Sequence, residues 1–474
     1  MGWLKAPARD PFVVRAILPP VFPSWRRPRR RCSAALSNGV AAALVCMALT
    51  ALLPCAVAVA QLPPADVPEQ AFPVPPATPL PPLPSPPVGW RRWLNPATAP
   101  FIPIPEIGAD PNGGTTLGIL PVWLRTDAQH EIDRIIAPDL FHNSYFGYGV
   151  HARLYAYPSE DEQWSVVAGL GERVNRAVDF EYQRGRARRD RWSLSASLIS
   201  DRDGAPRFYG TGNHTLQSAE TSYTAQQQVV RMQLGLNLSR IWQVSYTARA
   251  RVVDVLPGTL PGIASIQTRF GTGALGNGND FLHRLSIVYD TRDDLTTPRH
   301  GMQWIAYAGA ASSEAFNDAL YKEAGFDGRA FWPTFHDTVL AAHVALRYLL
   351  SDHNAPFWAL STLGGDRSDV GGEQPLRGFG AGRFTDRDAY SMTLEVRRRA
   401  FSFDTGSTVV DIELTPFVDA GRVFAGFGTF PLAHIHTVGG IGFRGVARPF
   451  VVGYVDIGYG TEGVAIFTGI SYPF

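Results

Sequence analysis

The sequence predicts an all-β transmembrane barrel of sixteen antiparallel strands, preceded by a cleaved leader and a Pro-rich linker. Three observations lead to this fold class: apolar and polar residues alternate along many segments, a secretory leader precedes them, and the chain ends in an aromatic residue. Charged residues make up 18% of the chain, whereas about a quarter is usual for soluble domains.

The overall composition excludes two broad classes of protein. The 474 residues include 43 basic and 42 acidic side chains, which gives a formal net charge of +1. A near-neutral chain is not a nucleic-acid-binding protein built on a basic face. A mean hydropathy of −0.05 excludes a polytopic helical membrane protein.

Residues 1–60 are predicted to be a cleaved signal peptide. A cluster of arginines at positions 26–31 precedes an apolar run from Gly39 to Ala60, which ends in the small-residue site Ala58-Val59-Ala60. The alternative is an uncleaved helical anchor, since this run is long enough to span a bilayer, but Pro54 and the cleavage site disfavour it. All three cysteines precede residue 60, so the mature chain would contain none and would suit an oxidising compartment.

Residues 61–105 are predicted to be a Pro-rich periplasmic linker. They hold 16 of the 38 prolines of the chain. Such a composition favours extended polyproline-type backbone and cannot bury a hydrophobic core. The remaining residues, 106–474, are assigned to the barrel.

The segments after residue 114 alternate with a period of two, which is the period of a β-strand. In 191–198, 230–239, 392–396 and 410–414, apolar residues occupy one face, and polar or charged residues, with one glycine, occupy the other. A soluble β-sandwich would bury the apolar face in a core. A membrane barrel would turn it to lipid and keep the polar face in a wet lumen. The arginines on the polar face and the secretory leader favour the barrel.

Counting these segments gives sixteen strands, an even number, as bacterial barrels require. They begin near residues 114, 146, 163, 176, 190, 222, 242, 281, 302, 320, 338, 389, 408, 435, 451 and 464. An even count places both termini on the periplasmic side of the outer membrane, with short turns there and the long connections 202–221, 255–280 and 351–388 outside. The candidates for an interfacial aromatic belt are Trp123, Tyr155, Trp192, Trp242, Tyr289, Trp304 and Trp332.

The last seven residues carry a recognisable pattern. Gly469, Tyr472 and the terminal Phe474 resemble the C-terminal signal by which Gram-negative outer-membrane barrels are recognised for insertion. This resemblance implies two partners for the chain, namely the barrel-insertion machinery and the outer-membrane bilayer.

The long connection 351–388 contains an arginine that could fold into the lumen. Arg377-Gly378-Phe379 lies in a glycine-rich stretch. In the later strands, Glu395 and Asp419 have the parity of lumen-facing residues, and Asp419 lies between Phe417 and Gly421. Charge-assisted hydrogen bonds between Arg377 and these carboxylates would hold the loop inside the barrel.

These residues resemble the BamA/TamA-type outer-membrane superfamily, also called the bacterial surface antigen family. The resemblance covers residues 106–474 and rests on Arg-Gly-Phe in the sixth outer loop, on Phe-x-Asp-x-Gly in a later strand and on a periplasmic turn. The residues of that turn motif are Asp290, Arg292, Asp293, Pro298 and Gly301.

The resemblance implies a barrel that inserts or translocates proteins or lipids, through a seam between its first and last strands. We expect those strands at Thr115–Thr126 and Val464–Phe474, weakened by Pro121 and Pro473. Residues 61–105 are too few for the family's POTRA domains, so the chain resembles a POTRA-less branch, and a separate periplasmic partner protein would supply their role.

Two other functions remain open at this point: a transport pore gated by the loop, and, more remotely, an outer-membrane hydrolase. The sequence contains no Gly-x-Ser-x-Gly, His-Glu-x-x-His or phosphate-loop motif. His434 and His436 are two residues apart and would share one face of a strand, where they could bind a metal, but a lone pair near the start of a strand is more often incidental. We therefore expect no catalytic residues, no cofactor, no metal and no nucleic-acid partner.

Overall fold

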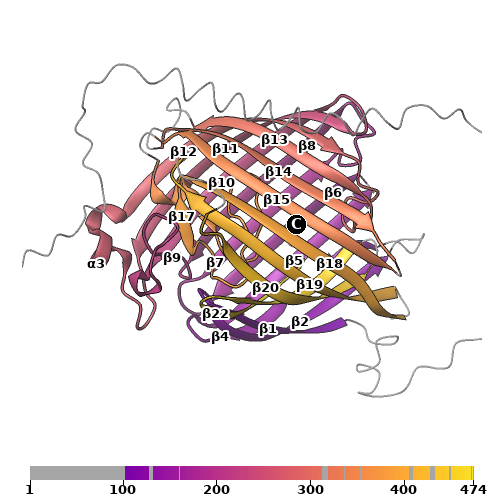
Figure 1. Cartoon of the computed structure of the whole chain (residues 1–474). Coiled ribbons are helices and arrows are strands. Elements are labelled where there is room, and N and C mark those ends of the chain that lie inside the picture. The colour runs from indigo at the N-terminus through magenta and orange to yellow at the C-terminus, as the bar shows by residue number, and fades with distance from the viewer. Residues whose placement is uncertain are drawn as a thin grey trace, which may run out of the picture.

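Antiparallel strands make up nearly all the regular structure of this chain, and they form one closed sheet (Figure 1). The computed structural model describes residues 102–474, apart from 127–131, 160, 312–318, 336, 353–354, 405–408, 427–432, 448–449, 471 and 473. The leader and most of the predicted linker therefore lie outside the described residues.

The barrel wall follows the chain order, each strand pairing with its neighbours in sequence. Its first part consists of β1 (Ile102–Asp110), β2 (Gly114–Thr126), β3 (Ile132–Ile136), β4 (Asp139–Asn143), β5 (Gly147–Ser159), β6 (Glu162–Gly171), β7 (Arg176–Arg184), β8 (Trp192–Asp203) and β10 (Thr221–Asn237). Its second part consists of β11 (Trp242–Pro257), β12 (Gly276–Asp290), β13 (Gly301–Ala311), β14 (Tyr321–Pro333), β15 (Thr338–Ser351), β18 (Asp388–Asp404), β19 (Val409–Phe424), β20 (His436–Ala447), β21 (Phe450–Gly460) and β22 (Gly463–Gly469).

The described wall has eighteen strands, so the prediction of sixteen is wrong. β3 and β4 both pair with β2 and β5, and together they form one wall strand that is interrupted at Ala137-Pro138. This interrupted strand and β1 are the two that the sequence did not reveal. Proline has no N–H to donate to a ladder and breaks the alternating pattern; Pro138 divides one of these strands, and Pro103 and Pro105 lie in the other.

The two additional strands change the positions of several predicted features. β1 begins at Ile102, so residues 102–105, assigned to the linker, lie in the wall. The segment near residue 114 is the second strand, and it runs in the direction opposite to the one expected. The long connection after β15 is consequently the seventh at its rim within the described chain, and the prediction of a sixth loop is wrong.

The two rims of the barrel differ in the length of their connections. The short-turn rim carries 238–241 and 334–337, together with both ends of the described chain. The long-loop rim carries 204–220, 258–275 and 352–387. It lies to the left in Figure 1, where α3 (Ile266–Phe270), β9 (Arg207–Phe208) and β17 (Phe384–Asp386) are labelled. This asymmetry is typical of bacterial outer-membrane barrels.

The long loops contain the few short elements of the structure. These are β9 (Arg207–Phe208), η1 (Gln217–Ala219), α3 (Ile266–Phe270), η2 (Thr272–Ala274), η3 (Phe357–Ala359), β16 (Ser361–Leu363) and β17 (Phe384–Asp386). Phe208 packs against Phe270 and Phe357, which joins three of these loops. In the described part of the chain, no helix has the length and apolar character to cross a bilayer.

The side chains follow the alternation that the sequence shows. On β10, Val230, Met232 and Leu234 face outward, and the Met232 side chain is 55% exposed. Such exposure suits a surface that contacts lipid. Trp242, Tyr289 and Trp304 are directly opposite one another in the register of β11, β12 and β13 and pack ring against ring at the short-turn rim, with centroids 4.9 and 5.3 Å apart.

One member of the expected aromatic belt lies elsewhere. Tyr155 shares the inward face of β5 with Tyr157, and both line a cavity of about 230 Å³ inside the barrel. Tyr155 therefore faces the lumen and does not belong to the aromatic belt on the outer surface.

The sheet closes between β1 and β22 through one residue pair in the described chain, Ala109 with Ile466. On its other side, β1 pairs with β2 through all nine of its residues. Pro121, expected at this seam, instead lies in β2 and faces Pro103. Backbone ladders thus join the wall strands continuously from β1 to β22, and a weak seam remains between these first and last strands.

Candidate functional site

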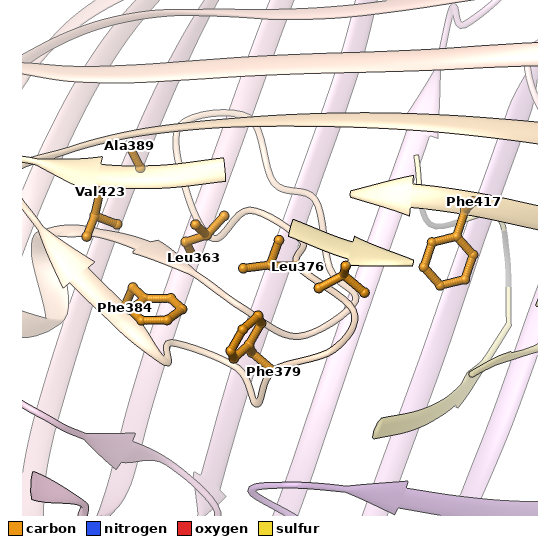
Figure 2. Close-up of a cluster of buried hydrophobic side chains, with 8 residues drawn as sticks. Leu363, Leu376, Phe379, Phe384, Ala389, Phe417 and Val423 are labelled. Carbon is orange, nitrogen blue, oxygen red and sulfur yellow. The ribbon is translucent and has the colours of Figure 1, made fainter. Parts of the chain in front are cut away.

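The connection between β15 and β18 folds back into the lumen. Its side chains Leu363, Leu376, Phe379 and Phe384 pack against the wall residues Ala389, Phe417, Val423 and Val438, and all eight are buried (Figure 2). Because this cluster removes large apolar side chains from the wet lumen, it favours the inward position of the loop.

Arg377 is fully buried and holds the loop against β19. Its Nε and Nη2 donate to the two carboxylate oxygens of Asp419 at 2.9 and 2.8 Å, and its backbone N–H donates to Asp419 at 3.1 Å. This is the bidentate fork geometry in which an arginine and a carboxylate interact most strongly.

Two further carboxylates and one ring complete the surroundings of Arg377. Nη1 donates to Glu395 at 2.6 Å and to Asp456 at 3.0 Å, and the guanidinium carbon lies 3.5 Å from the ring centroid of Phe417. Burial alone would lower the pKa of Arg377, but the charges of Asp419 and Glu395 outweigh it and raise that pKa above its ordinary value. The loop arginine is therefore permanently charged.

Arg377 belongs to a larger group that we call the lumenal ion cluster. Its members are Arg377, Arg397, Arg444, Glu395, Asp419 and Asp456, each at most 3% exposed. Arg444 contacts Asp456 and lies 3.5 Å from Glu395, and Arg397 donates to Glu395 at 3.0 Å. Three positive and three negative groups balance, so removing one of them leaves a buried charge without compensation.

Sequence reasoning did not find Asp456 and Arg444. Asp456 lies on the inward face of β21 together with Tyr454 and Gly458. The period-two pattern of the sequence could have predicted this orientation, but not the partners of Asp456. Gly458 allows the close approach of the loop, since a Cβ there would lie 1.9 Å from the carbonyl oxygen of Arg377.

The other residues of the two predicted motifs lie around this contact. Phe379 is in the apolar cluster, and Gly378 packs on the backbone of Gly460. Gly421 makes room for Leu363, whose methyl groups would lie about 3 Å from a Cβ at position 421. Both motifs thus meet at one place in the lumen.

The predicted turn motif forms a compact structure at the short-turn rim. Arg292 donates to both oxygens of Asp290, at 3.0 and 2.9 Å. The Asp293 carboxylate accepts three backbone N–H groups of the same turn. Gly301 has φ of +95°, and Pro298 lines a cavity of about 330 Å³ beside this turn.

The C-terminal residues turn into the barrel instead of continuing the last strand. β22 ends at Gly469. The Tyr472 hydroxyl donates to Glu413 at 2.8 Å, and the Phe474 ring stacks on His343 inside the lumen. The role of these residues as an insertion signal stays a prediction.

The two histidines considered for metal binding serve the long-loop rim. The carbonyl oxygen of His434 accepts from the side chain of Asn213, and the ring of His436 contacts the carbonyl of Asn213. Within residues 102–474 as described above, no group of three or more His, Asp or Glu side chains could hold a metal ion.

The lumenal loop also contacts the hairpins on both sides of the weak seam. The Asn112 side chain, in the turn between β1 and β2, donates to the carbonyl of Ala381 at 2.7 Å. Two residues further along the loop, Arg383 donates to both oxygens of Glu462, in the turn between β21 and β22, at 2.6–2.9 Å. Loop residues 381–383 therefore connect the two edges at the long-loop rim.

Comparison with known proteins identifies the family. The profile of the Omp85 superfamily domain matches residues 161–443, more than half of the chain. The chain belongs to the Omp85 superfamily. The resemblance inferred from the loop, strand and turn motifs is thus confirmed, and the chain is an outer-membrane β-barrel.

Several solved outer-membrane proteins are similar to this Omp85 barrel at low sequence identity. The comparison with curated proteins found no match. BamA from Haemophilus ducreyi lacking POTRA domains 1–3 is 13% identical over 78% of this chain and 75% of that chain, with a TM-score of 0.46. CdiB from Escherichia coli is 10% identical over 78% and 62%, with a TM-score of 0.41. CdiB from Acinetobacter baumannii is 12% identical over 78% and 65%, with a TM-score of 0.43.

Arg377→Ala is expected to lower the free energy of unfolding by about 3–5 kcal/mol, because it leaves an excess of buried negative charge. The double variant Arg377→Ala/Asp419→Ala should lose less than the sum of the single variants. Denaturant unfolding in detergent, followed by heat-modifiable gel mobility, measures this. Arg299→Ala is the control, since its ion pair with Asp337 is partly exposed to solvent. Additive losses would contradict the direct coupling.

The inward position of the loop is expected to weaken as pH rises. Burial raises the pKa of the Glu373 carboxyl to about 8 from an ordinary value of 4.5, although Arg367 opposes the shift. The folded loop therefore favours the neutral form of Glu373. The contribution of this carboxyl to the free energy of the inward loop position is lost as pH rises from 4.5 to about 8, and it does not change further above about pH 8. Hydrogen exchange of residues 364–383 from about pH 5 to pH 9 measures it. Glu373→Gln should remove the pH dependence, and a flat wild-type profile would refute the expectation.

Arg383→Ala is expected to loosen the seam, since it removes the contact with Glu462. Backbone amides of β1 and β22 should then exchange about tenfold faster, as the loss of one charge-assisted contact implies. The matched control is Arg269→Ala, at the same rim, whose side chain donates to the carbonyl of Ser218 and, among the described residues, has no carboxylate partner. Equal exchange in both variants would show that the loop does not hold the seam.

Proposed function

We propose that this Omp85 barrel assists the insertion or translocation of proteins or lipids at the outer membrane, through the seam between β1 and β22. The observation that carries the proposal is the single residue pair that joins these strands in the described chain, beside nine pairs between β1 and β2. Membership of the Omp85 superfamily supports it.

The physical argument concerns the number of hydrogen bonds that opening would break. Each backbone hydrogen bond contributes about 0.5–1.5 kcal/mol net, so separating β1 from β22 costs far less than separating any other neighbouring strands. An opened seam would expose two strand edges, and unpaired edges are templates for pairing with a further strand. A client strand could then pair with the barrel and pass sideways into lipid.

In this proposal, the short-turn rim and both termini face the periplasm, as the asymmetry of the connections suggests. Residues 61–101 would then lie on the periplasmic side, where a separate partner protein could deliver the client. The contacts of loop residues 381–383 with Asn112 and Glu462 would keep the seam closed at the outer end until a client arrives.

Locking the seam tests the proposal. Ala109 and Ile466 are directly opposite and both face outward, so Ala109→Cys/Ile466→Cys should form a disulfide across the seam. The sequence has no cysteine after Cys55, so no native thiol of the barrel would compete. We expect the oxidised variant to fail, and the reduced variant to succeed, in restoring the outer-membrane protein and lipid composition of cells that lack the native protein.

The matched control is Ala152→Cys/Ala168→Cys, which joins β5 to β6 at another outward pair of alanines. It should restore the cells whether oxidised or reduced. Full restoration by the oxidised seam variant would refute lateral opening. If that variant retained assembly but the purified barrel conducted ions in a planar bilayer, a gated solute pore would replace the proposal.

A further inference from the structure

Two arginines face each other on the outer surface of the barrel. Arg176, the first residue of β7, is directly opposite Arg202, near the end of β8, and both lie at the long-loop rim. Arg176 shares its face with the exposed Val178 and Phe180, and Arg202 shares its face with the exposed Leu198. The pair therefore points away from the lumen, on the side of the wall that contacts lipid.

The height of Arg202 places it at a membrane interface. Ten residues separate it from Trp192, an exposed outward-facing residue at the short-turn end of the same strand. At about 3.4 Å per residue and a tilt of about 40°, this spacing is about 26 Å along the membrane normal. The apolar band of outer-membrane barrels is about 25 Å tall. If Trp192 lies at one interface, Arg202 lies at the other, among lipid headgroups.

The pair carries two positive charges that no neighbouring acid balances. In the described part of the chain, neither guanidinium has a hydrogen-bond or ion-pair partner, and Nε of Arg202 is buried without one. The outward residue opposite Arg202 on the next strand is Gln226, and Asp254 lies one strand beyond it. Like charges directly opposite on a sheet destabilise it, so this arrangement calls for an anion.

The surface next to the pair is apolar. Leu170 is directly opposite Arg176 on the β6 side and is 67% exposed, and Val150 is opposite Leu170 on β5. Val178 lies two residues toward the centre of the band. A ligand at this place would meet cationic groups at the rim and hydrocarbon beside and below them, which is the arrangement of a lipid with a charged headgroup.

We propose that Arg176 and Arg202 bind the phosphate group of a lipid in the leaflet at the long-loop rim, with its acyl chains against Leu170 and Val178. A guanidinium presents a planar fork of donors that matches phosphate oxygens. One phosphate between the two forks would neutralise the pair. This site is separate from the seam and the lumenal loop, so it does not depend on the proposed function.

Lipid retention by the purified barrel tests the site. Native mass spectrometry would count diphosphoryl lipid A molecules bound to the wild type, to Arg176→Ala/Arg202→Ala and to Arg184→Ala. Arg184 is the control because it lies on the same strand, faces outward and is at the opposite rim. We expect the double variant to bind at least about tenfold more weakly, as the loss of charge-assisted hydrogen bonds implies, and the control to match the wild type.

Three arms make the outcome decisive. Arg176→Lys/Arg202→Lys keeps the charge but not the fork, and it should bind between the wild type and the alanine variant. Dephosphorylated lipid A should bind the wild type no more tightly than diphosphoryl lipid A binds the double alanine variant. Inorganic phosphate that displaces the lipid at equal concentration would refute a lipid site, as would equal binding by the wild type and the double variant. Heat-modifiable gel mobility confirms that each variant is folded.

Discussion

The ion contact between Arg377 and Asp419 is the interaction on which the interior of this barrel depends. An arginine from a glycine-rich loop enters the lumen, is fully buried, and meets three carboxylates on three wall strands. The cluster is neutral only when all of its members are present, so the loop is part of the wall's electrostatic balance and not a passive plug. Gly458 and Gly421 show the same constraint in the backbone, since a side chain at either position would displace the loop.

The position of this loop connects the interior to the seam. The same segment that places Arg377 at the ion cluster continues to Ala381 and Arg383, which contact the hairpins on either side of the β1–β22 junction. The wall is held by continuous backbone ladders, whereas the seam is held by one residue pair and by these loop contacts. Release of the loop would therefore weaken the closure at the long-loop rim, which gives the proposed lateral opening a physical control.

The outer surface contacts lipid instead of water, and its arginines have a different role from those of the lumen. In the lumenal ion cluster, Arg377, Arg397 and Arg444 are paired with carboxylates of the same chain. At the long-loop rim, Arg176 and Arg202 face outward and have no such partner among the described residues. The lumenal arginines fix the structure of the protein, and the outward pair would fix its contact with the membrane.

Much of the architecture follows from the sequence alone, because alternation with a period of two is a local property. It indicated a barrel, the strands from β5 onward, the inward orientation of Glu395 and Asp419, and the meeting of Arg377 with them. The alternation did not predict the number of strands, because the prolines of β1 and the break at Pro138 interrupt it. Only the pairing with neighbouring strands shows that these segments complete the wall. The tertiary structure also decided that Asp456 and Arg444 join the cluster, that Tyr472 and Phe474 turn inward, and that β1 and β22 form the seam. Each of these depends on contacts between residues far apart in the chain, which no local pattern encodes.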